Sequence, residues 1–158
     1  MIKMYKLSRT SGGFIQKFMF AIILVMIFSI VLTMFGSSSE VNVTACELTS
    51  DNVINEGRTW VRITSESKDE QSDHQLKIEF SSHELVTFFL GASPLEKQNG
   101  VWIYTEQINP KAIHTQEFGI VPTLEFGVND LTYGVNVVVY QDGNEIYQNN
   151  LDLRVYRP

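Results

Sequence analysis

The chain of 158 residues is 44% hydrophobic and carries a formal net charge of −6, from 18 acidic and 12 basic side chains. This length accommodates one globular domain and an additional segment, which excludes a large multidomain enzyme. The acidic balance offers no surface that neutralises phosphates, so we expect no nucleic acid among the partners.

The charge is distributed unevenly along the chain. Residues 1–36 contain no acidic side chain and four basic ones, Lys3, Lys6, Arg9 and Lys17, so the remaining 122 residues carry a net charge of −10. This asymmetry predicts that the two parts of the chain lie in different surroundings.

The first predicted element is an apolar helix from Phe18 to Phe35, interrupted only by Ser29 and Thr33. A helix of this length spans about 27 Å, close to the thickness of the hydrocarbon layer. All four basic residues precede it, so the positive-inside rule places the N-terminus in the cytoplasm. We therefore expect a single-pass signal anchor in the cell membrane, with a cytoplasmic basic N-terminus over 1–17, a transmembrane helix over 18–35 and an extracytoplasmic domain over 40–158.

Three kinds of processing compete with a retained anchor. Residues 36–39 are loosely suited to cleavage of a secretory signal. Residues 43–46 resemble a bacterial lipobox, in which Cys46 would be lipidated, although they lie well beyond the apolar segment. Gly13-Phe14 resembles a type IV pilin leader, in which cleavage after the glycine releases a helix that packs the filament core. We prefer the retained anchor.

From residue 40 onward, apolar residues recur mostly at every second position, and turn-forming residues separate short segments. This spacing is typical of β-strands with one buried and one exposed face. We predict strands over residues 40–48, 57–65, 75–80, 84–90, 100–105 and 116–121. The polar stretch over 65–74 is predicted to be a solvated loop.

The last 27 residues have the clearest pattern. We predict a hairpin with strands over 132–140 and 146–156, joined over 141–144 by a turn whose Gly143 tolerates positive φ. Eight strands without helical periodicity predict an all-β fold: an immunoglobulin-like antiparallel β-sandwich preceded by one N-terminal transmembrane helix.

Cys46 is the single cysteine of the chain and cannot form an intrachain disulfide. The exported domain must therefore be stabilised by the burial of apolar side chains. We expect Cys46 to be a small buried hydrophobe in the first strand, with an intermolecular disulfide or lipidation as the alternatives.

The sequence contains no recognisable active-site motif. His74, His83 and His114 lie in separate segments with no pair at metal-ligand spacing, and no nucleophile elbow, phosphate loop or Cys-x-x-Cys pair occurs. We expect no catalytic residue, no metal and no cofactor, and predict that the protein is not an enzyme. A hydrolase with paired carboxylates is an alternative that spacing alone leaves open.

A calcium site is a second alternative. Asp69, Glu70 and Asp73 could share an ion with Asp51 or Asn52. Because no glycine-containing loop places ligands at alternate positions, a solvated acidic loop is the preferred interpretation.

Three aromatic residues are candidate surface contacts. Trp60, Trp102 and Tyr104 lie on the face opposite the aliphatic residues of their own strands. Exposed together, they would form a stacking platform for sugars or a protein contact; covered by the second sheet, they would belong to the core, which we prefer. Asn42 begins an Asn-Val-Thr sequon and is a candidate glycosylation site.

Several segments together resemble a known family of surface domains. They are Gly-Val-Trp-Ile-Tyr at 100–104, Ile-Asn-Pro at 108–110, Phe118, Val121, the strand at 131–140 and Asp-Gly-Asn at 142–144. Through these segments, residues 40–156 resemble archaeal and bacterial cell-surface domains of the CARDB and related immunoglobulin-like type. The resemblance implies a non-catalytic adhesion, assembly or scaffolding module. An anchored helix followed by one sandwich also resembles the stator proteins of the archaellum.

These observations favour a membrane-anchored extracytoplasmic binding or scaffolding module, attached through residues 18–35, that contacts other envelope proteins. One alternative is a pilin-like filament subunit processed at Gly13, or an archaellum-associated filament or stator subunit. A surface carbohydrate-binding protein is the other.

Overall fold

The computed structural model describes residues 40–158, which form eleven strands. The strands are β1 (Val41–Leu48), β2 (Asn52–Ile54), β3 (Thr59–Ser67), β4 (His74–Ser81), β5 (Val86–Leu90), β6 (Ser93–Pro94), β7 (Glu96–Gln98), β8 (Val101–Ile108), β9 (Ile113–Pro122), β10 (Asp130–Gln141) and β11 (Asn144–Tyr156). The predicted segments 1–17 and 18–35 lie outside the described residues. Over 40–158, the structure has no helix long and apolar enough to cross a membrane.

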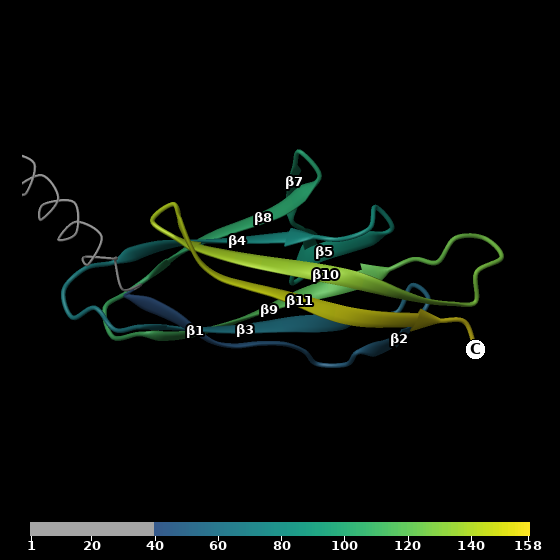
Figure 1. Ribbon diagram of the computed structural model, residues 1–158, viewed down its shortest axis with the longest axis horizontal. Coiled ribbons are helices and arrows are strands. Elements are labelled where there is room, and N and C mark those ends of the chain that lie inside the picture. Colours follow the sequence, from purple (N-terminus) through teal and green to yellow (C-terminus); the bar gives the residue numbers. More distant parts are fainter. Residues whose placement is uncertain (1–39) are drawn as a thin grey trace, which may run out of the picture. The chain divides into compact units, whose positions relative to one another are not determined.

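The strands form two sheets that pack face to face (Figure 1). The first sheet has the order β1-β3-β9-β5-β6 and the second the order β2-β11-β10-β4-β8-β7. Neighbouring strands are antiparallel except β2 and β11, which run parallel. The prediction of an all-β fold with two packed sheets is confirmed.

Alternation of buried and exposed residues explains how the sheets face each other. In β3, Val61 and Ile63 are buried while Arg62 and Thr64 are partly exposed, and β4 shows the same period of two. Successive side chains of a strand point to opposite faces, so each sheet has one apolar face, and burying these faces against each other forms the core.

Three phenylalanines join the sheets at the centre of the core. Phe80 from the second sheet stacks on Phe88, with ring centroids 4.9 Å apart, and contacts Phe118 at 4.8 Å. Phe88 and Phe118 both belong to the first sheet. All three are fully buried. Such close aromatic contacts contribute stability beyond the area that they bury.

The first strand departs from the predicted pattern. Strict alternation along residues 40–48 would put Ala45 on the same face as Val41 and Val43, but the register shifts between Val43 and Ala45. This β-bulge moves the alternation by one residue, so Cys46 and Leu48 pack against the core instead. The sequence is consistent with this shift, because strict alternation would direct Glu47 toward the core and Leu48 away from it.

The C-terminal hairpin is confirmed. Gln141 pairs with Asn144, so Asp142 and Gly143 alone form the loop. Both have positive φ, 50° and 86°. A two-residue turn of this type favours an Asp-Gly sequence, because glycine and aspartate tolerate the left-handed region better than other residues do.

Two further details differ from the sequence prediction. The segment 65–74 is not a solvated loop throughout, because β3 continues to Ser67, β4 begins at His74, and Ser65, Ser67 and His74 are buried. The short strands β2, β6 and β7 were not predicted. With two or three residues each, they are too short to show a period.

We expect Phe118→Ala to destabilise the domain by about 3–5 kcal/mol, because it removes an aromatic ring that both sheets contact and leaves a cavity. Urea denaturation followed by circular dichroism measures the loss. Ile113→Ala is the matched control: Ile113 lies in the same strand but is 66% exposed, so its effect should stay within about 0.5 kcal/mol. Equal losses in the two variants would contradict this description of the core.

Candidate functional site

The most unusual polar group of the interior is His74, the first residue of β4. Its side chain lies on the inner face of the second sheet, in phase with Leu76 and Ile78, and the residue is 6% exposed. Three carboxylates surround the imidazole, from Glu40, Asp69 and Asp142. We refer to these four residues as the His74 cluster, and to the end of the sandwich that carries them as the proximal end.

Asp142 holds one nitrogen of the ring. The imidazole Nδ1 lies 2.7 Å from Asp142 Oδ2, and the backbone N–H of Gln75 donates to Asp142 Oδ1 over 2.9 Å. The tight turn between β10 and β11 brings Asp142 to this position beside the start of β4. A carboxylate only accepts hydrogen bonds, so the contact assigns a proton to Nδ1.

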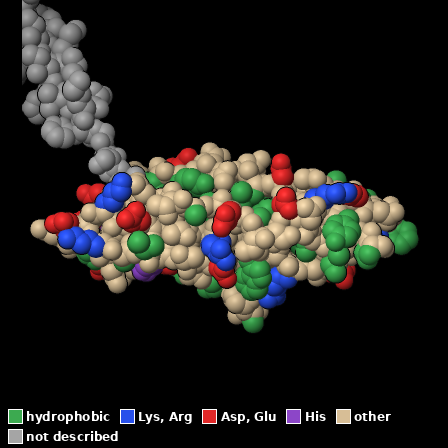
Figure 2. Space-filling view, turned by 90° about the horizontal axis from the view of Figure 1, so that it is seen from below, with side chains coloured by type: hydrophobic (Ala, Val, Ile, Leu, Met, Phe, Trp, Pro, Cys, Tyr) green, Lys and Arg blue, Asp and Glu red, His purple; other side chains and the backbone are tan. Residues whose placement is uncertain are grey.

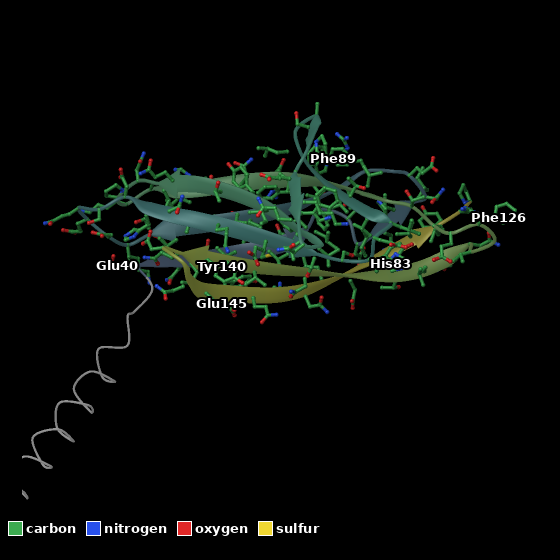
Figure 3. The ribbon with its side chains drawn as sticks, turned by 90° about the horizontal axis from the view of Figure 1, so that it is seen from above. Glu40, His83, Phe89, Phe126, Tyr140 and Glu145 are labelled. Carbon is green, nitrogen blue, oxygen red and sulfur yellow. The ribbon has the colours of Figure 1, made fainter. Side chains whose placement is uncertain are left out.

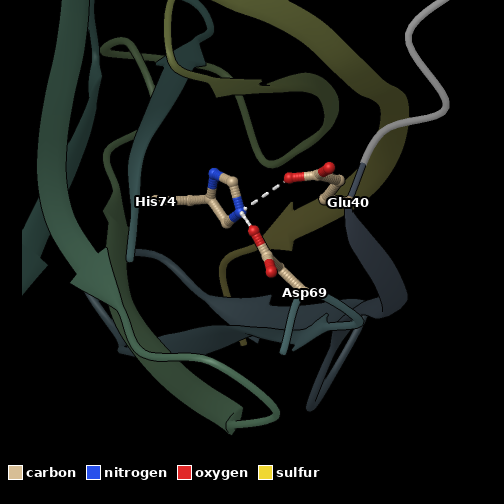
Figure 4. Close-up of side chains that lie close together, drawn as sticks. All are labelled: Glu40, Asp69 and His74. Carbon is tan, nitrogen blue, oxygen red and sulfur yellow. Dashed lines mark hydrogen bonds and ion pairs between the residues drawn. The ribbon is translucent and has the colours of Figure 1, made fainter. Parts of the chain in front are cut away.

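The other nitrogen faces two carboxylates. His74 Nε2 lies 3.1 Å from Asp69 Oδ2 and 3.1 Å from Glu40 Oε2 (Figure 4). Asp69 belongs to the loop between β3 and β4, and its Oδ1 accepts a hydrogen bond from the backbone of Gln71. Glu40 directly precedes β1. Three segments that are distant in sequence therefore meet at one imidazole.

Gln141 connects the cluster to the first strand. Its Oε1 accepts a hydrogen bond of 3.0 Å from the backbone N–H of Val41, which fixes the orientation of the amide. The amide nitrogen then lies 3.1 Å from His74 Nδ1 and 3.5 Å from Asp142 Oδ2. The hydrogen bond from Val41 to Gln141 thus connects the start of β1 to the end of β10 in the second sheet.

These contacts change the protonation equilibria of the cluster. The hydrogen bond to Asp142 raises the pKa of His74, opposed by partial desolvation, and Asp69 and Glu40 add to the increase. The backbone N–H of Gln75 and the contact with His74 lower the pKa of Asp142. The backbone N–H of Gln71 contributes most to lowering the pKa of Asp69 to about 2. Asp69 and Asp142 therefore stay ionised near neutral pH, which gives the cluster a negative charge.

The arrangement offers one imidazole nitrogen and carboxylate oxygens to a proton or a metal ion. With a neutral ring protonated on Nδ1, the lone pair of Nε2 would face two carboxylate oxygens, which is repulsive. A second proton on the ring, or a cation between the three groups, removes this repulsion. The other two histidines lie outside the His74 cluster. The ring of His83 packs on that of Tyr133, and Nδ1 of His114 lies 3.8 Å from Oε2 of Glu106.

A second candidate site lies at the opposite end of the sandwich, where apolar side chains are exposed. Figure 3 shows Glu40 and Phe126 at opposite ends of the domain, and Figure 2 shows hydrophobic side chains near one end of it. The exposed large hydrophobic residues there are Ile54, Phe126, Leu131 and Tyr156, which we call the distal tip. Phe126 is fully exposed.

The loop that carries Phe126 is held by the C-terminus. Arg157 donates from Nη2 to the carbonyls of Leu124 and Glu125, and its backbone N–H donates to Asn129. Ile54 and Leu131 are close to this loop because β2 and β10 both flank the end of β11. The tip is therefore built from three segments and is preorganised by hydrogen bonds.

The three candidate aromatics do not form one platform. Trp102 and Tyr104 face the core: the Trp102 ring lies 6.2 Å from Phe88, and Tyr104 meets Phe118 edge-on at 5.1 Å. Trp60 belongs to the other sheet and alternates with buried neighbours, so it faces outward. The aromatic face of β8 is thus the buried face.

Trp60 is covered in part by its own neighbours. The guanidinium of Arg58 lies 5.5 Å from the centre of the Trp60 ring and 5.2 Å from that of Phe89. Cation–π contacts of this kind contribute about 0.5–1 kcal/mol at exposed sites. Trp60 therefore shares its face with Phe89 and an arginine rather than with Trp102.

Asn42 and Cys46 both lie in β1. Asn42 is half-buried and pairs with Glu66 of β3. Cys46 pairs with Ile63 and is half-buried against the core, and burial raises the pKa of its thiol. The position of Cys46 agrees with a small hydrophobe in the first strand.

The alternative calcium site is not formed. Asp69 follows the end of β3 that pairs with the start of β1, whereas Asp51 follows the end of β1. The two lie at opposite ends of the β1–β3 ladder, so they cannot share an ion. Asp69 instead joins the His74 cluster.

Sequence reasoning missed the His74 cluster. Its members are separated by up to 102 positions, and none of them forms a metal or catalytic motif with another. The one available signal was the Asp142-Gly143 turn, because it fixes the position of a carboxylate at a sheet end.

Comparison with known proteins shows similarity in structure alone. No family model and no curated protein matches the sequence. The chain is similar to the Pseudomonas fluorescens alkylpurine DNA glycosylase AlkC (12% identity, TM-score 0.44), with 75% of this chain and 31% of the glycosylase covered. It is also similar to a conjugative transposon lipoprotein from Bacteroides eggerthii (12% identity, TM-score 0.47, 72% and 93% covered). A third similar structure is the periplasmic chaperone SfaE (13% identity, TM-score 0.38, 72% and 57% covered).

We expect His74 to stabilise the metal-free domain in a pH-dependent way. Its pKa in the folded state lies above the ordinary 6.5, so this contribution is fully present below pH 6.5 and is lost as the pH rises through the folded-state pKa. Urea denaturation in EDTA from about pH 5.5 to about pH 9 measures the contribution as the difference between wild type and His74→Gln.

His83→Gln is the control, because His83 is exposed and lies outside the cluster. A pH dependence that His83→Gln removes and His74→Gln retains would contradict its assignment to His74. A His74 contribution that grows as the pH rises would contradict the assigned contacts.

Proposed function

We propose that this protein is a membrane-anchored module that displays an immunoglobulin-like β-sandwich outside the cell and binds another envelope protein without catalysis. The observation that carries the proposal is the distal tip, where Phe126 is fully exposed beside three other apolar side chains. Exposed apolar groups that gather at one place are typical of protein interaction sites.

The position of the tip suits this role. The described chain begins at Glu40 at the proximal end, and Phe126 lies at the other end (Figure 3). If residues 18–35 span the membrane with the basic residues on the cytoplasmic side, the domain lies outside the cell, where envelope proteins are accessible to it. The hydrogen bonds from Arg157 hold the loop in place, so little conformational entropy is lost on binding.

The alternative functions have weaker support. A sugar-binding platform needs aromatic rings on one exposed face, but Trp102 and Tyr104 pack against the core while Trp60 lies on the other sheet. A pilin-like filament subunit would use the same N-terminal helix after processing at Gly13. The mass of the N-terminal peptide distinguishes it from a retained anchor.

Cysteine labelling tests the topology. In a Cys46→Ala background, we expect a membrane-impermeant maleimide to label Glu145→Cys on intact cells, because Glu145 is exposed at the hairpin of the extracytoplasmic domain. Ser8→Cys should react only after permeabilisation, because the positive-inside rule keeps residues 1–17 in the cytoplasm. The reverse pattern would refute the anchor, and labelling of neither variant on intact cells would refute the export of the domain.

Photo-crosslinking tests the docking surface. A photoreactive residue at position 126 in living cells should give a discrete adduct with an envelope protein, and Leu131→Ser should reduce its yield severalfold. The control position is 113, where Ile113 is also exposed and apolar but lies outside the tip. The proposal fails if position 126 gives no adduct, or if the adducts at positions 113 and 126 are the same.

A further inference from the structure

We propose that Glu40, Asp69 and His74 bind a divalent transition-metal ion, for which Zn²⁺ is the best match, with Asp142 orienting the imidazole. This inference does not depend on the proposed docking function. It rests on the geometry, the charge and the polar environment of the His74 cluster.

The donor atoms already converge. Nε2 of His74 lies 3.1 Å from oxygens of both Glu40 and Asp69, and single donor atoms of the three residues lie within 4.8 Å of one another. Tetrahedral zinc with bonds of about 2.1 Å separates its ligands by about 3.4 Å. The Glu40 side chain is 53% exposed, so it can move to close the difference. Figure 4 shows the three groups directed toward a common point.

The charge of the site favours a cation. Three carboxylates face one imidazole, and none of the lysine and arginine ion pairs formed within residues 40–158 involves Glu40, Asp69 or Asp142. Counted over the three carboxylates, a second proton on His74 leaves a net charge of −2 (−3 + 1), whereas a divalent ion on the neutral ring leaves −1 (−3 + 2). The ion would also replace the repulsion between the Nε2 lone pair and the two carboxylates with coordination bonds.

The surroundings resemble those of a metal ligand. Metal-binding histidines usually donate the other ring N–H to a carboxylate, which fixes the tautomer and makes the ligand more basic. Asp142 Oδ2 occupies this position, 2.7 Å from Nδ1. Independently, the hydroxyl of Ser67, two residues before Asp69, is buried and has no hydrogen-bond partner in the part of the chain that the structure describes.

The ligand types identify the class of metal. One imidazole nitrogen and two carboxylate oxygens match the ligands of zinc, whereas calcium and magnesium take six or more oxygens. The exposed side of Glu40 leaves a coordination position open to solvent. Bound there, the ion would join the segment before β1 to the loop between β3 and β4 and to the start of β4.

The test is titration of the full chain, kept in detergent, with ZnCl₂ against a chromophoric chelator. We expect one ion per chain in the wild type and at least about a tenfold loss of affinity in His74→Gln and in Asp69→Asn. Asp142→Asn, which keeps the three ligands, should weaken binding by about 10- to 100-fold. His83→Gln and His114→Gln are the matched controls and should bind as the wild type does.

Folding of each variant is checked by circular dichroism, and Glu40→Gln replaces any variant that does not fold, because Glu40 is exposed. Zn²⁺ should also raise the Tm of the wild type and leave that of His74→Gln unchanged. The proposal is overturned if the wild type binds less than one ion per chain. Equal affinity in wild type, His74→Gln and Glu40→Gln would also overturn it, because the ion would then bind elsewhere.

Discussion

The structure depends on the burial of two apolar sheet faces against each other. Phe80 from one sheet packs between Phe88 and Phe118 from the other, and aliphatic side chains of both sheets surround them. The chain has one cysteine, so no intrachain disulfide can assist this contact. Both sheets must therefore keep strict registers, because a slip of one residue would turn an entire strand's apolar side chains toward the solvent.

The apolar core ends differently at the two ends of the sandwich. At the proximal end the interior changes from apolar to ionised, and the carboxylates around His74 accept hydrogen bonds from the backbones of Gln71 and Gln75. These bonds compensate for the cost of removing charge from water. At the distal tip the apolar residues continue into the solvent. One end of the sandwich is therefore closed by polar contacts, and the other leaves apolar side chains exposed.

The His74 cluster also shows how sheet geometry brings distant residues together. Four strand ends lie at the proximal end: the start of β1, the end of β3, the start of β4 and the end of β10. They meet there because paired antiparallel strands run in opposite directions, so one begins where the other ends. Residues in the loops and turns at this end of the sandwich are therefore neighbours in space even when they are far apart in sequence. Glu40 and Asp142 meet at one imidazole for this reason, and the position of Asp142 is fixed by the turn that it forms with Gly143.

The sequence by itself determined the strands with a clear period of two, the Asp-Gly turn and the need for a core without disulfides, because these follow from local alternation and from the conformational preferences of single residues. The bulge that turns Cys46 toward the core was not predicted from the sequence, and alternation alone left both faces of β8 open, although the core was the preferred place for Trp102 and Tyr104. Only the tertiary structure decided which face of β8 is covered, since that depends on the opposing sheet. It alone brought Glu40, Asp69, His74 and Asp142 together, because pairing between distant strands, and not spacing along the chain, sets the distance between their side chains.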